Sequence, residues 1–384
     1  MGGAPLRARA WYARKMNPKV SIRNSFGRDT WPIILPPGRT NRCICATMLC
    51  QCVAKMTQLN IINWFCLNEI QFGLETCTKA RNFASERTIL RFETTIQRPV
   101  TASGVGLHSG VPVQIRILPA PVSTGIVFLR TDLENFPIPA SWRHVARVSY
   151  ATSLMRQGVL ISTTEHLLSV FYSMGIDNAF VEIDNLEVPI LDGSGLPFVR
   201  LIEEAGIRQY RRKRRYLRIR RPISVEDRGK RISILPAEGF CLTCDIDFAP
   251  PVGRQSLELE VTPERYATEI APARTFGFEY DLDQMRNMGL IRGASLDNAV
   301  CFTRDGVLNP GGLRAPDECC RHKALDLIGD LALLGRPLLG HVIAERAGHA
   351  MHAALVARIM SDPSLYEIIT FDQLASRVTR ALVS

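Results

Sequence analysis

Apolar and polar residues alternate with the period of a β-strand in several stretches that follow Arg91. This period of two appears in "VPVQIRILPA", "NAFVEIDNLEVPI" and "RISILPAEGFCLTCDIDF", with glycine- or proline-containing turns between them. The helical period appears instead in "ISTTEHLLSVFYSMG", "LPFVRLIEEAG", residues 316–334 and the end of "LLGHVIAERAGHAMHAALVARIM". After residue 88, each half of the chain therefore predicts strands followed by a helix that carries a histidine.

This repeated order predicts an α+β fold made of two similar two-layer α/β domains, residues 89–210 and 211–375. We expect the domains to pack helix to helix, with the active site at their junction. The basic run "RQYRRKRRYLRIRRP" lies where they meet, and we interpret it as a solvated boundary. A surface that faces an anionic ligand or a lipid is the alternative.

The formal net charge of +10 is concentrated near the N-terminus. Residues 1–88 contain 13 Lys and Arg against 4 Asp and Glu, whereas the remaining 296 residues contain 34 and 33. This division weakens a nucleic-acid-binding function for the folded body. We expect residues 1–88 to be a poorly ordered basic extension, either a leader that resembles an organellar transit peptide or translated sequence ahead of the true start.

The cysteine spacing gives no strong metal or disulfide signal. Cys43 to Cys52 follow a C-x-C-x4-C-x-C pattern, which lacks the paired C-x-x-C of zinc ribbons. Cys241 and Cys244 have that spacing but lie on a predicted strand, where an odd separation sends the thiols to opposite faces. A reducing compartment fits this usage, and no apolar run of about 18 residues predicts a transmembrane helix. We expect a cytoplasmic protein, or an imported one if residues 1–88 act as a transit peptide.

The stretch "RHKALDLIGD" carries the clearest candidate chemistry. At about 100° per residue, His322, Asp326 and Asp330 fall within roughly an 80° stripe of the predicted helix. A histidine and an aspartate one turn apart can bind one metal ion. The alternative is a solvated polar face on an ordinary amphipathic helix.

The stretch "STTEHL" in the first half offers a third metal ligand. If His166 points toward the junction, it joins His322 and Asp326 in a catalytic type of zinc site with one position left for water. Glu165 can then act as the general base. Ser162 and Glu165 also match a capping box at a helix start, which is the structural alternative for Glu165.

The stretch "AGHAMH" provides a candidate acid. His349 follows Gly348 in a predicted turn, where a lone histidine is either structural or catalytic. In the catalytic interpretation, its imidazolium stabilises oxyanion charge and protonates the leaving amine. Asp330, one turn beyond Asp326, could hold this imidazole and raise its pKa.

Eight motifs occur in a fixed order between about residues 90 and 370. They are "SGVGLHSG", "STTEHL", "GIDNAFVEIDNLEVPILDGSGLPFV", "ARTFGF", "GASLDNAV", "LNPGGLR", "RHKALDLIGDL" and "GHA". Together they resemble the zinc-dependent UDP-3-O-acyl-N-acetylglucosamine deacetylases of lipid A (lipopolysaccharide) biosynthesis. The resemblance implies a hydrolase that uses a zinc-bound water to remove acetate from UDP-3-O-(3-hydroxyacyl)-N-acetylglucosamine, an early committed step. We further expect a monomer that binds this acylated UDP-sugar, has no nucleic-acid partner and contacts a membrane surface only transiently.

The resemblance also implies a role for each of nine residues. The zinc (Zn2+) ligands are His166, His322 and Asp326, the catalytic residues are Glu165 (base), His349 (acid), Asp330 (which orients the acid) and Thr275 (oxyanion), and the substrate contacts are Phe276 and Lys323. His352 falls where the family often carries an amide, so we expect a packing or surface residue there. Two rivals remain: a metallohydrolase of the same fold that acts on another amide or ester, and a basic protein that binds nucleic acid or an anionic membrane.

Overall fold

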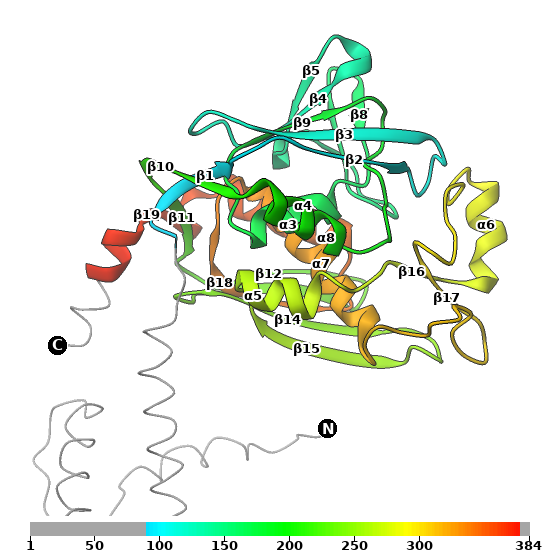
Figure 1. Cartoon of the computed structure of the whole chain (residues 1–384). Coiled ribbons are helices and arrows are strands. Elements are labelled where there is room, and N and C mark those ends of the chain that lie inside the picture. Colours follow the sequence, from blue (N-terminus) through cyan, green and yellow to red (C-terminus); the bar gives the residue numbers. More distant parts are fainter. Residues whose placement is uncertain (1–89, 377–384) are drawn as a thin grey trace, which may run out of the picture. The chain divides into compact units, whose positions relative to one another are not determined.

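A computed structural model describes residues 90–376, and the structural statements below concern this part of the chain. The fold is α+β, as the sequence predicts. Two sheets lie on either side of a central group of helices, α3, α4, α7 and α8 (Figure 1). Within this group, α3 (Glu165–Ser173) packs against α7 (Glu318–Leu331), which is the expected helix-to-helix contact.

The first sheet has five strands in the order β2–β3–β9–β4–β5. Their bounds are Val100–Val105 (β2), Pro112–Pro119 (β3), Ile126–Arg130 (β4), Phe136–Pro139 (β5) and Ala179–Ile183 (β9). Along β3, Val113, Ile115 and Ile117 are buried while Gln114 and Arg116 are exposed. This alternation turns one face of the sheet toward the helices, including α4 (Leu196–Ala205).

The second sheet has seven strands built around β18. Their bounds are Arg215–Ile219 (β11), Ile223–Asp227 (β12), Lys230–Leu235 (β13), Phe240–Asp247 (β14), Arg254–Glu260 (β15), Leu338–Glu345 (β18) and Tyr366–Thr370 (β19). β18 runs parallel to β11 and β14 and antiparallel to β13. Helices α7 and α8 (His349–Ser361) pack against this sheet. On β14, Cys244 is buried and Cys241 is half-buried, which fits thiols on opposite faces.

The fold also contains three smaller sheets and the short helices α5 and α6. Their bounds are Phe92–Ile96 (β1) and Ile207–Lys213 (β10), Val145–Arg147 (β6), Ser153–Arg156 (β7) and Val159–Ile161 (β8), Phe276–Phe278 (β16) and Val300–Phe302 (β17), with Pro263–Arg265 (α5) and Leu282–Asn287 (α6). α6 lies beside β16 and β17 at one side of the molecule (Figure 1).

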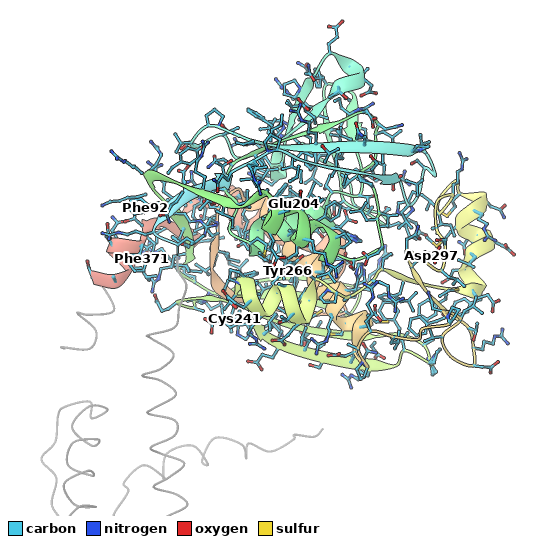
Figure 2. All side chains as sticks on the ribbon, in the orientation of Figure 1. Phe92, Glu204, Cys241, Tyr266, Asp297 and Phe371 are labelled. Atoms are coloured by element: carbon cyan, nitrogen blue, oxygen red, sulfur yellow. The ribbon has the colours of Figure 1, made fainter. Side chains whose placement is uncertain are left out.

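The basic run forms strands, so its interpretation as a solvated boundary is only half right. β10 is mostly exposed and pairs with β1, and the expected domain limit at residue 210 falls inside it. In β11, by contrast, Tyr216 and Leu217 are buried within the second sheet. Near β1, Arg91 forms an ion pair with Asp372; their sequence neighbours Phe92 and Phe371 are labelled in Figure 2.

The main hydrophobic core draws residues from both sheets and from the helices between them. Phe128 of the first sheet, Leu242 of the second and Phe171 of α3 belong to one cluster. Tyr266, labelled near the middle of Figure 2, is fully buried, and its hydroxyl lies 2.5 Å from that of Ser169 on α3. This continuous packing fixes α3 relative to both sheets.

Candidate active site

A glycine allows α3 and α7 to approach each other closely. A Cβ atom at Gly329 would lie 2.0 Å from the Glu165 carbonyl oxygen and 2.7 Å from its carbonyl carbon. Only a residue without a side chain fits at this crossing. The contact brings the start of α3, with Glu165 and His166, against the middle of α7, with His322 and Asp326.

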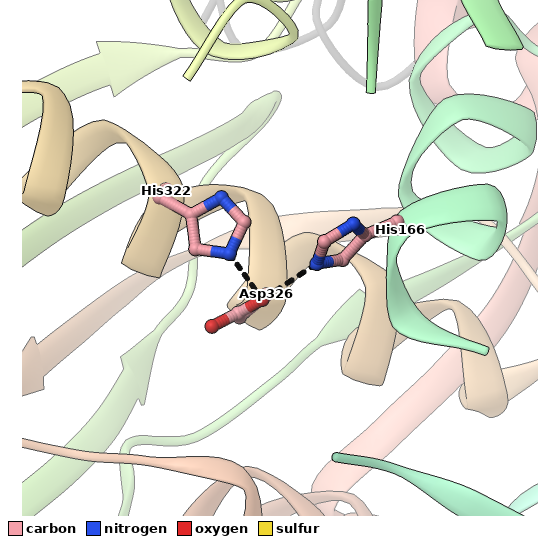
Figure 3. Close-up of side chains that lie close together, drawn as sticks. All are labelled: His166, His322 and Asp326. Atoms are coloured by element: carbon pink, nitrogen blue, oxygen red, sulfur yellow. Dashed lines mark ion pairs between the residues drawn. The ribbon is translucent and has the colours of Figure 1, made fainter. Parts of the chain in front are cut away.

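His166, His322 and Asp326 converge from these two helices (Figure 3). Nε2 of His322 lies 3.4 Å and Nε2 of His166 lies 3.8 Å from Oδ1 of Asp326, and one ligand atom from each residue lies within 4.8 Å of the others. All three side chains are buried. The whole of α7 is nearly buried, so the alternative of a solvated polar face is wrong.

The protonation states of these three side chains suit a metal ion. Burial lowers the pKa of His166 to about 3 and also lowers the pKa of His322, so both imidazoles are neutral. Burial opposes ionisation of Asp326, but the charges of Lys323, whose Nζ donates to Oδ2 at 2.6 Å, and of His349 hold its pKa far below the usual range. Two neutral imidazoles and one carboxylate form a donor set that can hold a metal ion.

The backbone orients one of the two imidazoles. Nδ1 of His322 lies 3.0 Å from the carbonyl oxygen of Ala273, a contact that leaves Nε2 free to face Asp326. Nδ1 of His166 is buried and has no hydrogen-bond partner among the described residues. The two histidines are therefore held in different ways.

A carboxylate and an imidazole flank this set. Oε1 of Glu165 lies 3.9 Å from Nε2 of His349, which also lies 3.9 Å from Oδ2 of Asp326. Burial raises the pKa of Glu165 to about 8, against the attraction of His349. Burial works to lower the pKa of His349, but the charge and hydrogen bond of Asp330 raise it to about 9. This pair can move protons near neutral pH.

Glu165 does not cap its helix in the way that the capping-box alternative requires. The N-cap residue is Thr164, which makes no side-chain cap hydrogen bond, and the Ser162 hydroxyl contacts that of Ser153 instead. Oε2 of Glu165 accepts a hydrogen bond from the backbone N–H of Thr152 at 3.0 Å. The second carboxylate oxygen is thus left to face His349.

The sequence analysis missed three residues of the site. Thr152 is buried, and its hydroxyl donates to Oδ1 of Asp330. His352 is also buried, with Nδ1 at 2.8 Å from Oδ2 of Asp330, so it is not a surface residue. His108 lines the cavity, and its motif "SGVGLHSG" was visible in the sequence without pointing to a role. For Thr152 the sequence held no signal, because its contacts come from distant segments.

A buried ion pair joins the Thr275 loop to the start of α7. Glu318 accepts hydrogen bonds from Nε of Arg274 at 2.9 Å and from the backbone N–H groups of Arg274 and Arg314. The loop held in this way carries Ala273, which contacts His322, and Thr275, which lines the cavity. Arg274 and Glu318 therefore connect the loop to the helix that bears two of the candidate ligands.

A cavity of about 630 Å³ opens over these groups. Eight of the nine residues implicated by the sequence line it: Glu165, His166, Thr275, Phe276, His322, Lys323, Asp326 and His349. The ninth, Asp330, lies behind His349 and contacts its Nδ1 at 2.7 Å. Nζ of Lys323 lies 5.9 Å from the ring centroid of Phe276. The cavity continues along apolar residues of the segment 277–300, including Leu282, Met285, Ile291 and Leu296.

Comparison with known proteins shows the family to which the chain belongs. The family model described as UDP-3-O-acyl N-acetylglycosamine deacetylase matches residues 93–361. A UDP-3-O-acyl-N-acetylglucosamine deacetylase of Solibacter usitatus (strain Ellin6076) is 87% identical over 295 residues, which cover 77% of this chain and 100% of that protein. The chain belongs to this deacetylase family. The deacetylase of Myxococcus xanthus (strain DK1622) is 48% identical over 72% of this chain and 88% of that protein.

Proposed function

We propose that this family member removes acetate from UDP-3-O-(3-hydroxyacyl)-N-acetylglucosamine, and that it does so with a zinc ion held by His166, His322 and Asp326. The observation that carries the proposal is the convergence of these three buried side chains between Glu165 and His349, at the base of a cavity with an apolar extension. Two imidazoles and one carboxylate are a donor set typical of catalytic zinc.

Zinc, when bound, supplies Lewis-acid chemistry: its charge lowers the pKa values of a water and of the nearby Glu165 carboxyl, and it polarises the acetamide carbonyl. Glu165 takes the proton of the attacking water, since its free oxygen faces the cavity. The Thr275 side chain donates to the oxyanion as the carbonyl carbon becomes tetrahedral.

His349 completes the reaction as the acid. Its imidazolium, held at Nδ1 by Asp330, presents Nε2–H to the cavity and protonates the departing amine. Lys323 and Phe276 contact the substrate beside the reacting group. The apolar residues of the 277–300 segment hold the 3-O-acyl chain, so that binding energy from the chain supports catalysis at the amide.

Metal analysis coupled to an acetate-release assay tests the proposal. We expect one zinc ion per chain and release of acetate from the acylated UDP-sugar. Glu165→Ala should lower kcat by roughly 10²–10⁴-fold and keep the metal, whereas Glu203→Ala, at an exposed position on α4, is the matched control. Zinc-loaded protein that releases no acetate would refute the function, and full activity of E165A would refute the base.

The acyl chain separates this proposal from a hydrolase of another amide or ester. UDP-N-acetylglucosamine without the chain should react with a much lower kcat/KM, because it cannot fill the apolar extension of the cavity. Equal kcat/KM values for the two substrates would favour the alternative hydrolase.

A further inference from the structure

The carboxylate of Asp330 is held by more groups than a simple acid–carboxylate pair needs. Oδ2 lies 2.7 Å from Nδ1 of His349 and 2.8 Å from Nδ1 of His352, while Oδ1 accepts from the hydroxyl of Thr152. His349 and His352 lie three residues apart on α8, so they occupy one face of that helix. Asp330, His349 and His352 are all buried.

The hydrogen bonds define the tautomer of His352. Asp330 is ionised, because its imidazole neighbours keep its pKa at about 2 although burial opposes this. An ionised carboxylate only accepts hydrogen bonds, so each Nδ1 that contacts Oδ2 must carry a proton. Burial lowers the pKa of His352, which leaves a neutral ring with its one proton on Nδ1.

We propose that His352 is a positioning residue of the catalytic acid: its Nδ1–H donates to Oδ2 of Asp330 and keeps this oxygen turned toward His349. The proposal rests on the function proposed above. Thr152 fixes the other oxygen, so the plane of the carboxylate is set from both sides. Without the His352 donor, only Thr152 and His349 itself hold the carboxylate, so the ring of His349 is held less firmly in its direction toward the cavity.

Two rival roles for His352 lead to different experimental outcomes. His352 can be a core residue whose polar atom is merely satisfied by the nearest carboxylate, in which case its loss lowers stability alone. Asp330, His349 and His352 also lie close enough to hold a second metal ion. In that case the loss of His352 lowers the metal content of the protein.

Substitutions that keep or remove the donor separate the positioning role from these two rivals. In His352→Asn, Nδ2 replaces Nδ1 at the same distance from Cβ, whereas His352→Leu places a methyl group there. We expect H352L to lower kcat about tenfold, the effect of one lost hydrogen bond to a charged group, with unchanged KM and unchanged bound zinc. H352N should restore kcat to within about threefold of the original enzyme. His341→Leu is the control, since His341 contacts Thr243 on the second sheet and does not line the cavity.

Histidine ¹⁵N spectra of the zinc enzyme, unaltered and with the H352L substitution, supply a second test. They should show the Nδ1–H tautomer for His352, and the signal of His349 should change in H352L. An Nε2–H tautomer for His352, equal kcat values for H352L and H341L, or the loss of a second metal equivalent in H352L would each overturn the proposal. Absence of acetate release by the unaltered zinc enzyme would instead refute the proposed function.

Discussion

Asp330 acts at the scale of a single residue by setting the charge state of His349. Its charge and hydrogen bond raise the pKa of His349 to about 9 although burial works to lower it. The proposed acid must be protonated to work, so we expect activity below this pKa and a loss of activity as the pH rises through it. In Asp330→Asn the imidazolium loses its partner, and the alkaline limb of kcat/KM should move to lower pH by about 1–2 units. A pH–rate profile checks this, and an unmoved limb would contradict the role of Asp330.

The residues that the sequence predicted and those that it missed differ in a physical way. His322, Asp326 and Asp330 were predictable because the helical period alone places them on one stripe. His166 could be proposed as their partner from its position on a helix, and the structure brings it there. Thr152 and His352 could not be assigned, because their contacts with Asp330 depend on how β7, α7 and α8 meet. The sequence also did not indicate that the side chain of His352, which replaces an amide that the family often carries, points toward Asp330.

At the scale of elements, the crossing of α3 and α7 depends on Gly329. A Cβ atom there would meet the backbone of Glu165 at 2.0 Å, and backbone cannot move aside as a flexible side chain can. Gly329→Ala should therefore separate the helices, pull His166 away from Asp326, weaken metal binding at least about tenfold and lower stability by about 1–3 kcal/mol.

Metal titration and chemical unfolding of the Gly329 variant measure these two effects. Gly311→Ala is the matched control, because a Cβ atom at Gly311 meets nothing within 4 Å. Normal metal affinity in G329A would show that the crossing tolerates a side chain.

The ion pair between Arg274 and Glu318 joins a loop to the start of α7. Glu318→Gln removes the charge and leaves the buried guanidinium of Arg274 without its partner, which should cost about 3–5 kcal/mol of unfolding free energy. Glu269→Gln breaks the more exposed pair with Arg265 and should cost at most about 1 kcal/mol. Urea unfolding of both variants checks the difference. Equal losses of unfolding free energy would mean that the buried ion pair stabilises the protein no more than the exposed one does.

The type of most elements could be predicted from the sequence, but several bounds could not. The strand–turn–helix order of β18 and α8 appeared in the apolar pattern, since strand and helix periods are distinct there. The helix expected in "ISTTEHLLSVFYSMG" begins only at Glu165, because Val159–Ile161 pairs with β7 as a strand. Likewise, the charge of the basic run hid a strand whose apolar residues Tyr216, Leu217 and Ile219 are buried.

At the scale of the whole molecule, the uneven distribution of positive charge assigns deacetylation and non-specific binding to nucleic acid to different parts of the chain. Residues 1–88 hold nine of the ten net positive charges, the family match begins at residue 93, and the C-x-C-x4-C-x-C pattern lies outside the described residues. Within residues 90–376, no helix is both long and apolar enough to cross a bilayer. The proposed catalytic groups all lie between Thr152 and His352, and α7 contributes apolar residues to both of the larger buried clusters.

A chain that begins at residue 89 should therefore keep its zinc and release acetate at the same kcat/KM as the full chain. It should lose most non-specific binding to duplex DNA, because such binding scales with the number of phosphates that Lys and Arg neutralise. Acetate assays and DNA titrations at several salt concentrations on both chains measure the two properties separately. A shortened chain that still binds DNA with a steep salt dependence would place the binding surface on the folded body, where β10 and its exposed arginines are the segment to test. A shortened chain that loses deacetylase activity would show that residues 1–88 contribute to the active enzyme.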